Sequence, residues 1–294
     1  MNKFKLLSFI TVIAILTRCA SNTGKSDAYG NFESDETTIS SEVSGRVISL
    51  NLEEGQDLEE NQLVAIIDTT QLVLKRAELK EQLKALEATM NSVRNKIKAQ
   101  EEQVKTIRIE KKRLHKLLQD SAATDKQWDD IMGQLRIAEA NLKSVQSELD
   151  KVIHNKKSVQ AKLEQLQDRI DKCYVENPYP GTVLEKYINQ HELAAPGKPL
   201  YKTADLANMY LRAYITGAQL SQIKLGQKVK VKFDRNSEKE YTIPGEITWI
   251  ADNAEFTPKI IQTKDVRVDL VYAIKVKVKN DGRIKLGMPG EVLF

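Results

Sequence analysis

The sequence predicts an α+β protein. In it a long antiparallel α-helical coiled-coil hairpin is inserted between two halves of a small β domain, and further β-strands follow. Three observations predict this fold class. The stretch from Gln71 to Asp171 contains no proline and repeats its apolar residues with the 3.5-residue period of a coiled coil. The segments on either side of it share one pattern of glycine turns and short apolar strands. Beyond them, apolar and polar residues alternate as in half-buried strands.

The N-terminus has the features of an export signal. Lys3 and Lys5 precede an apolar run from Leu6 to Thr17. At about 12 residues this run is too short to cross a bilayer as a helix, which needs about 20. We therefore expect residues 1–19 to form a secretory signal and the chain to be exported.

Cys19 is the expected lipidation site. Residues 16–19, Leu-Thr-Arg-Cys, resemble a lipoprotein signal, although Arg18 stands where a small residue is usual. Ordinary cleavage near Ala20, or retention of the segment as an anchor, remains open. The polar, Gly/Ser-rich residues 20–37 are expected to form a flexible tether.

Residues 71–172 carry the strongest pattern, two apolar registers on each arm of the expected hairpin. Gln100, Lys111 and Lys156 are the polar exceptions. The first arm has Leu79, Leu86, Val93, Ile107 and Leu114 in one register and Leu72, Leu83, Met90, Ile97, Val104 and Leu118 in the other; the second arm has Trp128, Leu135, Leu142, Leu149, Leu163 and Ile170, and Ile131, Ala138, Val145, Val152, Val159, Leu166 and Cys173.

The pattern loses phase between Gln119 and Asp125, where we expect a turn. Thr124 or Asp125 can cap the second helix. Two nearly equal arms around one short joint predict an antiparallel hairpin. With about 48 residues in each arm, the hairpin would be roughly 70 Å long. Cys173 ends one register and is expected to be a buried apolar residue.

The segments before and after the hairpin, residues 38–70 and 173–205, form an internal repeat. Each contains a glycine turn, a short apolar strand, a polar turn and a second apolar strand that ends in aspartate. Glycine supplies the positive φ that such tight turns require. The sequence therefore predicts one small β domain whose two halves are separated by the hairpin.

This repeat resembles biotinyl/lipoyl-like domains, which are β-sandwiches built from two such half-motifs. In carriers of that type a lysine between the halves is modified, but here the hairpin occupies that place. A split lipoyl-like domain with a helical insertion resembles the HlyD family of periplasmic adaptors, the membrane fusion proteins. The resemblance covers nearly all of the mature chain and implies a split biotinyl/lipoyl-like β-sandwich.

Residues 206–294 resemble the family's β-barrel domain with a minimal membrane-proximal segment. Residues 229–233 alternate strictly, and further strands are expected at 243–250 and 270–278. Residues 254–259, Ala-Glu-Phe-Thr-Pro-Lys, resemble a stretch common in adaptors that partner ABC transporters. Residues 286–290 resemble the turn near the end of the family's barrel.

The resemblance implies that the hairpin tip docks onto a TolC-like outer-membrane channel. The family's tip pattern is an Arg, a Leu four residues later, a Ser or Thr eleven after the Arg, and often an Asp. Arg113, Leu117, Thr124 and Asp129 match it. Singly, each has an ordinary explanation: Arg113 as a solvated helix residue, Leu117 as a seam residue and Thr124 as a helix cap. The spaced set favours docking.

The resemblance also implies the partners and the location. We expect an inner-membrane transporter, with an ABC type favoured and MFS or RND types open. We expect a homo-oligomer, commonly a hexamer in the family, that lines a conduit. The chain would be held by its N-terminal anchor at the periplasmic face of the inner membrane. The exported substrate is not encoded in an adaptor.

Several function classes are excluded. The net charge is +4 and charges of both signs are intermixed, so no basic face predicts nucleic-acid binding. His115, His154 and His191 are scattered, and no nucleotide, hydrolase or metalloprotease motif occurs, so we expect no enzyme, cofactor or metal site. A structural envelope coiled-coil protein and a lipoyl or biotin carrier are the alternatives. The repeat argues against the first, and the missing carrier lysine against the second.

Overall fold

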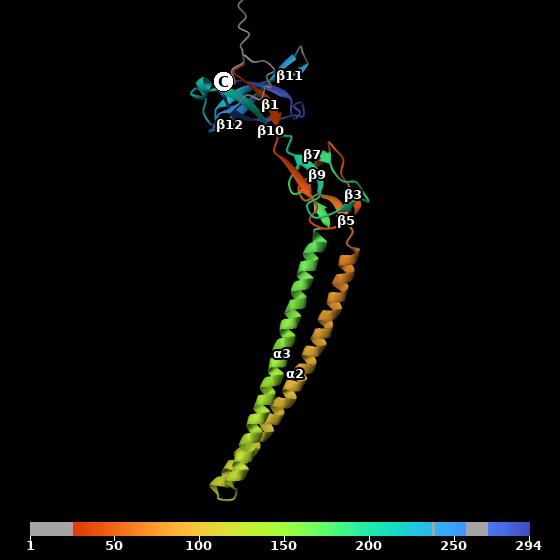
Figure 1. Ribbon diagram of the computed structural model, residues 1–294, viewed down its shortest axis with the longest axis vertical. Helices are drawn as coiled ribbons and strands as arrows, with labels where there is room; N and C mark the ends of the chain where they lie inside the picture. Colours follow the sequence, from red (N-terminus) through yellow and green to blue (C-terminus); the bar gives the residue numbers. More distant parts are fainter. Residues whose placement is uncertain (1–25, 237–238, 257–269) are drawn as a thin grey trace, which may run out of the picture. The chain divides into compact units, whose positions relative to one another are not determined.

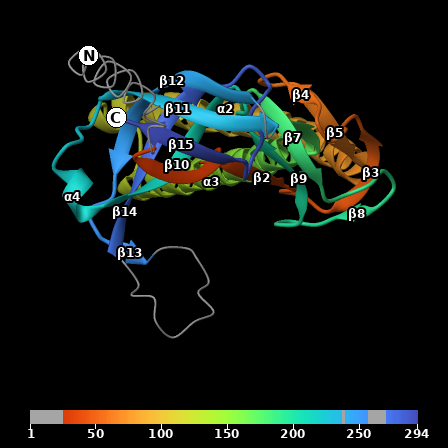
Figure 2. The same ribbon diagram turned by 90° about the horizontal axis from the view of Figure 1, so that it is seen from above.

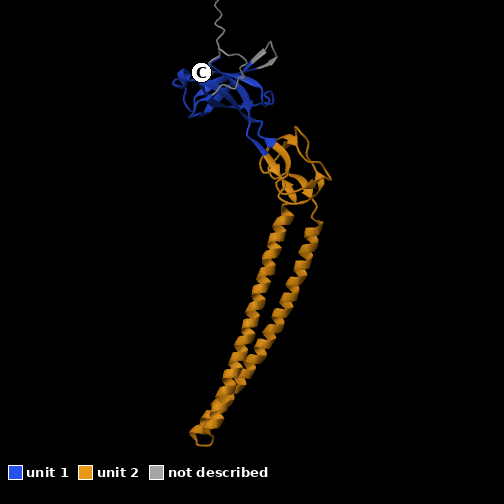
Figure 3. Ribbon diagram, viewed as in Figure 1, with its two compact units in different colours: residues 1–37, 203–294 blue, residues 38–202 orange. Residues whose placement is uncertain are grey.

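The computed structural model describes residues 26–236, 239–256 and 270–294. The chain divides into two compact units, one of residues 38–202 and one that combines the described parts of 1–37 and 203–294 (Figure 3). The expected signal, Cys19 and residues 257–259 lie outside the described residues. Within the described part, no helix is both long and apolar enough to cross a membrane.

Helices α2 (Thr70–Gln119) and α3 (Asp125–Asp171) form the helical hairpin, with 50 and 47 residues (Figure 1). Both expected registers lie in the seam between them, which confirms the coiled-coil hairpin. Buried seam residues are Leu79, Val93, Val104 and Ile107 on α2 and Ile131, Leu135, Ala138, Val152, Val159, Leu166 and Ile170 on α3. These buried residues are aliphatic, and full burial of each large side chain stabilises the hairpin by about 1.5–3 kcal/mol.

The polar interruptions of the registers are also in the seam. Gln100, Lys111 and Lys156 are half-buried. The Nζ of Lys156 lies 2.8 Å from a carboxylate oxygen of Glu87 on the other arm, so this seam cation has an ion-pair partner. The interruption therefore reflects a paired charge and not a break in the hairpin.

The β-sandwich of the unit formed by residues 38–202 (orange in Figure 3) consists of two four-stranded sheets, ordered β2-β9-β7-β4 and β6-β5-β3-β8. Each sheet takes two strands from before the hairpin and two from after it, so neither half can complete a sheet alone. The strands are β2 (Glu36–Ser40), β3 (Gly45–Leu50), β4 (Asp57–Leu58) and β5 (Leu63–Ile67) before the hairpin, and β6 (Tyr174–Glu176), β7 (Gly181–Lys186), β8 (Leu193–Ala194) and β9 (Pro199–Ala204) after it.

The internal repeat extends to the buried polar groups. Ser41 and Asn177 follow the first strand of each half, and both are buried. The amide of Asn61 donates to the carbonyl of Asn177 (2.7 Å), and the amide of Gly197 donates to that of Ser41 (2.8 Å). The hydroxyl of buried Tyr201 donates to Oδ1 of Asn177 (3.0 Å), and burial raises the pKa of this phenol. The bonds of Asn61 and Gly197 join the two halves, and the bond of Tyr201 satisfies buried Asn177 within the second half.

The other unit (blue in Figure 3) is an antiparallel barrel. Its strand order is β10-β1-β15-β11-β12-β14-β13, and an additional β10–β14 pairing closes the ring. The elements are β1 (Ala28–Glu33), β10 (Asn208–Thr216), α4 (Gly217–Leu220), β11 (Lys228–Asn236), β12 (Lys239–Ile250), β13 (Glu255–Phe256), β14 (Leu270–Lys279) and β15 (Pro289–Leu293). Closure removes the free edges that an open sheet would expose.

Strand β1 differs from the expected tether. Residues 20–37 were expected to be flexible, yet β1 lies between β10 and β15 (red in Figure 2), and β2 begins at Glu36. Its Ala28 and Phe32 are buried in the barrel core. Gly30 is required by packing, because a Cβ there would lie 1.8 Å from the carbonyl oxygen of Arg212. The glycine content that suggested flexibility therefore reflects close contact between strands.

Candidate functional site at the hairpin tip

The tip of the hairpin is a short turn built from backbone hydrogen bonds. The amide of Ser121 donates to the carbonyl of Leu118 (3.1 Å), and the amide of Ala122 donates to that of Leu117 (2.7 Å). Ser121 adopts φ 55°, which ends α2 in a left-handed residue. The turn thus satisfies several of the last carbonyls of α2 and fixes where α3 starts.

Thr124 caps the N-terminus of α3. Its Oγ1 accepts from the amide of Gln127 (3.3 Å), and Oε1 of Gln127 accepts from the amide of Thr124 (2.9 Å). This reciprocal pair is a capping box. The predicted capping role of Thr124 is confirmed, and its exposed side chain remains at the surface of the tip.

The structure places Arg113 and Leu117 on one side of the hairpin, Asp129 on the other, and Thr124 in the turn between the helices. Leu117 is 41% exposed, so it is not a seam residue; Leu114 and Leu118 contribute to the seam instead. Arg113 lies one turn before Leu117, on the same side of α2, and is exposed. Asp129 is also exposed, but it stands one heptad before Arg136, on the other flank of the hairpin.

A groove that the sequence did not predict runs along that other flank, with a volume of about 670 Å³. We call it the basic groove. It is lined by Arg108, Lys111, Lys112 and His115 of α2 and by Trp128, Met132, Leu135, Arg136 and Glu139 of α3. The Nζ of Lys111 lies 5.8 Å from the centroid of the Trp128 ring, and the His115 ring lies 5.3 Å from it. The sequence feature that could have indicated this groove is Lys111, a polar residue that interrupts the seam register and lies beside Trp128.

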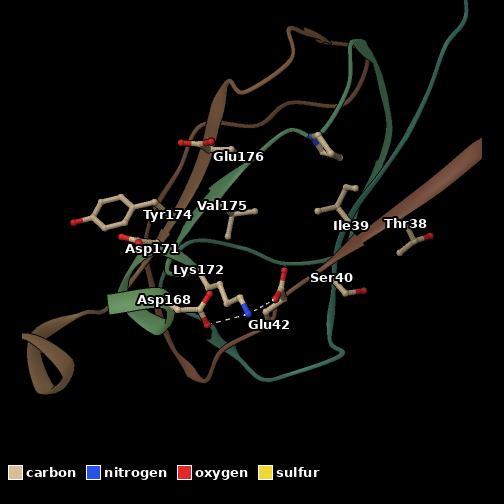
Figure 4. A pocket seen from close by; sticks show the side chains of 11 residues that line it. Thr38, Ile39, Ser40, Glu42, Asp168, Asp171, Lys172, Tyr174, Val175 and Glu176 are labelled. Atoms are coloured by element: carbon tan, nitrogen blue, oxygen red, sulfur yellow. Dashed lines mark ion pairs between the residues drawn. The ribbon is translucent and has the colours of Figure 1, made fainter. Parts of the chain in front are cut away.

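A second hollow, of about 430 Å³, lies where α3 meets the sandwich (Figure 4). There Lys172 pairs with Glu42 (3.1 Å) and Asp168 (3.2 Å). Hydrogen bonds to Glu42 and Asp168 raise the pKa of the Lys172 ammonium group. The ion pairs connect the end of α3 to the residues after β2, which is a structural role. No cluster of three or more His, Cys, Asp or Glu side chains in the described ranges could hold a metal ion.

The histidines and Cys173 have separate environments. His115 packs beside Trp128 at the tip, His154 is exposed on α3, and His191 lies in a turn of the sandwich. Cys173 is buried, as expected, and its Sγ contacts the carbonyl of Arg169 (3.3 Å). Burial, and then the nearby Asp68 carboxylate, raises the pKa of this thiol. A raised pKa disfavours the reactive thiolate.

Sequence comparisons relate this chain to a domain family and to several proteins named as membrane proteins. Residues 205–294 match the model of the LcnD-like, C-terminal domain. A UPF0194 membrane protein of Yersinia pseudotuberculosis serotype O:3 (strain YPIII) is 24% identical over 329 residues, covering 100% of this chain and 99% of that protein. A UPF0194 membrane protein from the asrC 5' region of Acidithiobacillus ferridurans is 29% identical over 174 residues, covering 55% of this chain and 51% of that protein.

Two solved structures share the fold. MacA from Actinobacillus actinomycetemcomitans superposes with a TM-score of 0.62 at 21% identity, covering 90% of this chain and 76% of MacA. The membrane fusion protein Spr0693 from Streptococcus pneumoniae R6 superposes with a TM-score of 0.59 at 13% identity, covering 90% and 99%. At these identities the likeness concerns the fold, and it includes the inserted hairpin.

Proposed function

We propose that this chain is an HlyD-like membrane fusion protein, an adaptor of efflux systems that bridges an inner-membrane transporter to a TolC-like outer-membrane channel. Several copies would line the export conduit. The proposal goes beyond the fold, because it assigns the outer contact to Arg113, Leu117, Thr124 and Asp129 at the hairpin tip.

The exposure of Leu117 is the observation that carries the proposal. A leucine outside the seam, 41% exposed, contributes little to the packing of its own hairpin. Beside it, Arg113 has no ion-pair partner among the described residues and is free to offer its guanidinium fork. Arginine is enriched in interaction hot spots, and the exposed leucine beside it adds apolar surface that a partner could cover. Thr124 adds a surface hydroxyl, although it also caps α3.

An ABC transporter is the inner-membrane partner that we favour. The support is the resemblance of residues 254–259 to adaptors of that type, and only the first part of this stretch lies in the described residues. MFS and RND transporters are the alternatives. A purely structural coiled-coil protein is disfavoured, because a rod has no need for a split sandwich and a closed barrel.

The anchor that we propose is a lipid on Cys19. Ala28 begins β1, so the chain between Cys19 and the barrel can reach at most about 30 Å. A lipid at Cys19 would therefore hold the barrel close to the membrane surface, facing the transporter. We propose a ring of copies, six by analogy with the family, around the conduit.

The test is photo-crosslinking in cells, with a photoreactive residue at position 113. The matched control is position 94, which is also an exposed Arg on α2 but lies far from the tip. We expect an adduct with an outer-membrane channel protein from position 113 and none from position 94. Adducts from position 113 that contain only copies of this chain would contradict the docking assignment.

A further inference from the structure

The exposed apolar side chains of the barrel gather at one of its ends. Among the barrel residues whose side chains the structure describes, the large hydrophobic ones that stand out from the surface are Tyr29 (53% exposed), Leu225 (68%), Trp249 (40%) and Leu270 (57%). They belong to β1, to the loop between α4 and β11, to the end of β12 and to the start of β14. We call these four residues the apolar rim.

The strand registers place Tyr29 and Leu270 at the same end of the barrel. Tyr29 pairs with Tyr214, two residues before β10 ends at Thr216. Thr216 in turn pairs with Val271, which directly follows Leu270. Helix α4 begins at the next residue after β10, so its label marks this end in Figure 2.

Leu225 and Trp249 lie at this end as well. Strand β12 runs antiparallel to β14, so the end of β12, where Trp249 precedes Ile250, lies beside the start of β14. The amide of Gly226, next to Leu225, donates to the carbonyl of Ile247 (2.8 Å), two residues before Trp249. The apolar rim thus follows the edge of the barrel over neighbouring elements, whereas ordinary exposed apolar residues are scattered singly.

The chain enters the barrel at the same end. Strand β1 begins at Ala28, which pairs with Val292, and the amide of Asp27 donates to the carbonyl of Val292 (2.9 Å). The apolar run of residues 6–17 and Cys19 precede this entry point in the sequence. Since the chain between Cys19 and Ala28 spans at most about 30 Å, an anchor on Cys19 would hold the apolar rim close to the membrane.

Charge does not identify a partner for this end of the barrel. The exposed charged residues there are of both signs: Lys224, Lys228, Asp27 and Asp252. Glu255 is already paired with Arg212 (3.0 Å). Positive and negative side chains therefore balance, and the apolar side chains are what distinguishes this surface from the rest of the barrel.

We infer that the apolar rim lies in the interface of a phospholipid bilayer. Trp and Tyr side chains are enriched at membrane–water interfaces, because each has an apolar body and a polar tip. Leu225 and Leu270 add aliphatic contact with the acyl chains, and Lys224 and Lys228 can bury their stems while their ammonium groups stay in water. The reason for choosing a membrane and not a protein as the occupant is that the N-terminal segment enters the barrel at this same end.

The inference rests on the proposed function only in that the N-terminal segment holds the chain at a membrane. The four side chains bury little surface, so the rim alone would bind a bilayer weakly. An anchor on Cys19 raises the effective concentration of lipid at the rim, and the two attachments together determine which end of the barrel faces the membrane. Because the charges at this end balance, the contact should be insensitive to salt.

The test is quenching of Trp249 fluorescence by brominated lipid. The chain has two tryptophans, Trp128 and Trp249, so Trp128→Phe leaves Trp249 as the only one. The full-length variant is reconstituted into phosphatidylcholine vesicles whose acyl chains carry bromine, which quenches only tryptophans that contact the lipid. Relative to vesicles without bromine, we expect the emission of Trp249 to fall, at low and at high salt alike. In both kinds of vesicle it should lie at shorter wavelengths than in detergent-free buffer.

Trp249→Phe is the matched control, because it leaves Trp128, near the hairpin tip, as the only tryptophan. Its emission should be the same with and without bromine. Emission of Trp249 that does not change with bromine would overturn the inference and would mean that the rim faces a protein. Quenching that requires anionic lipid and disappears at high salt would contradict insertion of an apolar surface.

A substitution in the rim gives a second test in the Trp128→Phe background. Leu225→Asp should restore most of the emission of Trp249, because it places a charge in the contact with lipid. Ile137→Asp makes a similar change at an exposed isoleucine of α3 and should leave the quenching as it was. Undiminished quenching in Leu225→Asp, with helicity unchanged by circular dichroism, would contradict the assignment of the rim.

These measurements separate the inference from the proposed function. A chain that sediments with the vesicles but keeps Trp249 unquenched is anchored without the rim, so this inference alone fails. Quenching of Trp249 without a channel adduct from position 113 supports the inference, and the docking assignment alone fails. A chain that stays in solution when the vesicles sediment contradicts the anchor and the inference together.

Discussion

Gly55 and His191 occupy the same turn in the two halves of the β-sandwich. Both have a left-handed backbone, with φ 84° and 73°. The amide of Gly55 donates to the carbonyl of Val183, and the amide of His191 donates to that of Val47, each over 2.8 Å. Each half thus donates the same hydrogen bond to the other, and His191 has a backbone role at the place where its counterpart is glycine.

Gly→Ala substitutions should have opposite effects in the turn at Gly55 and inside helix α3. Gly55→Ala should lower the free energy of unfolding by about 1 kcal/mol, because a left-handed φ disfavours a Cβ. No atom lies within 4 Å of the added methyl, so the cost is conformational and not steric. Gly133→Ala, inside α3, should raise the free energy of unfolding by about 1 kcal/mol, since alanine is the better helix former. Chemical denaturation of the two variants measures both; a loss of stability in Gly133→Ala would contradict the argument.

The seam register predicts a second pair of effects. Ile107 is buried between the arms, whereas Ile109 is exposed two residues later on α2. Ile107→Ala should lower the free energy of unfolding by about 2–4 kcal/mol, because it leaves a cavity. Ile109→Ala should change it by less than about 0.5 kcal/mol. Thermal unfolding followed by helical circular dichroism distinguishes them, and equal effects would show that the seam is assigned to the wrong residues.

Periodic sequence patterns were informative for the hairpin and not for the N-terminal segment. The hairpin could be predicted because its seam residues recur over both arms, so that a few polar exceptions such as Lys156 did not hide the period. Strand β1 could not be predicted, because only Ala28 and Phe32 point into the core and Gly30 suggested a flexible segment. The basic groove was missed because it is formed by residues of two arms that come together only in the folded hairpin.

The position of β1 between β10 and β15 predicts that its buried side chains stabilise the barrel. Phe32→Ala should lower the stability of the barrel by about 3–5 kcal/mol, because the ring is buried against Phe233, with centroids 6.0 Å apart. Tyr29→Ala should have little effect, since Tyr29 is 53% exposed. Amide hydrogen exchange of β10 and β15 measures the change; equal protection in Phe32→Ala and the parent chain would mean that β1 is dispensable.

The hydrogen bonds of Asp68 predict that the free energy of unfolding depends on pH in the acid range. Its Oδ1 accepts from the hydroxyl (2.6 Å) and the amide (2.9 Å) of Thr70, the first residue of α2. These hydrogen bonds lower the pKa of Asp68 in the folded state below its ordinary value of 3.8. The stabilisation is therefore present above pH 3.8 and is lost as the pH falls through the lower, folded-state pKa. Asp68→Asn should be less stable than the parent at neutral pH, and the difference should shrink below pH 3.8 in denaturation curves. A difference that stays constant with pH would show that the charge of Asp68 is irrelevant.

Arg113 provides the functional prediction. Arg113→Asp should abolish export while the helicity and thermal unfolding of the hairpin stay unchanged, because the side chain is exposed and has no ion-pair partner among the described residues. Reversal of the charge would replace the guanidinium fork, which binds carboxylates with two parallel hydrogen bonds, by a repelling carboxylate. Arg94→Asp makes the same change on the same helix far from the tip and should export normally. Normal export by Arg113→Asp would show that the docking site does not include this side of the hairpin tip.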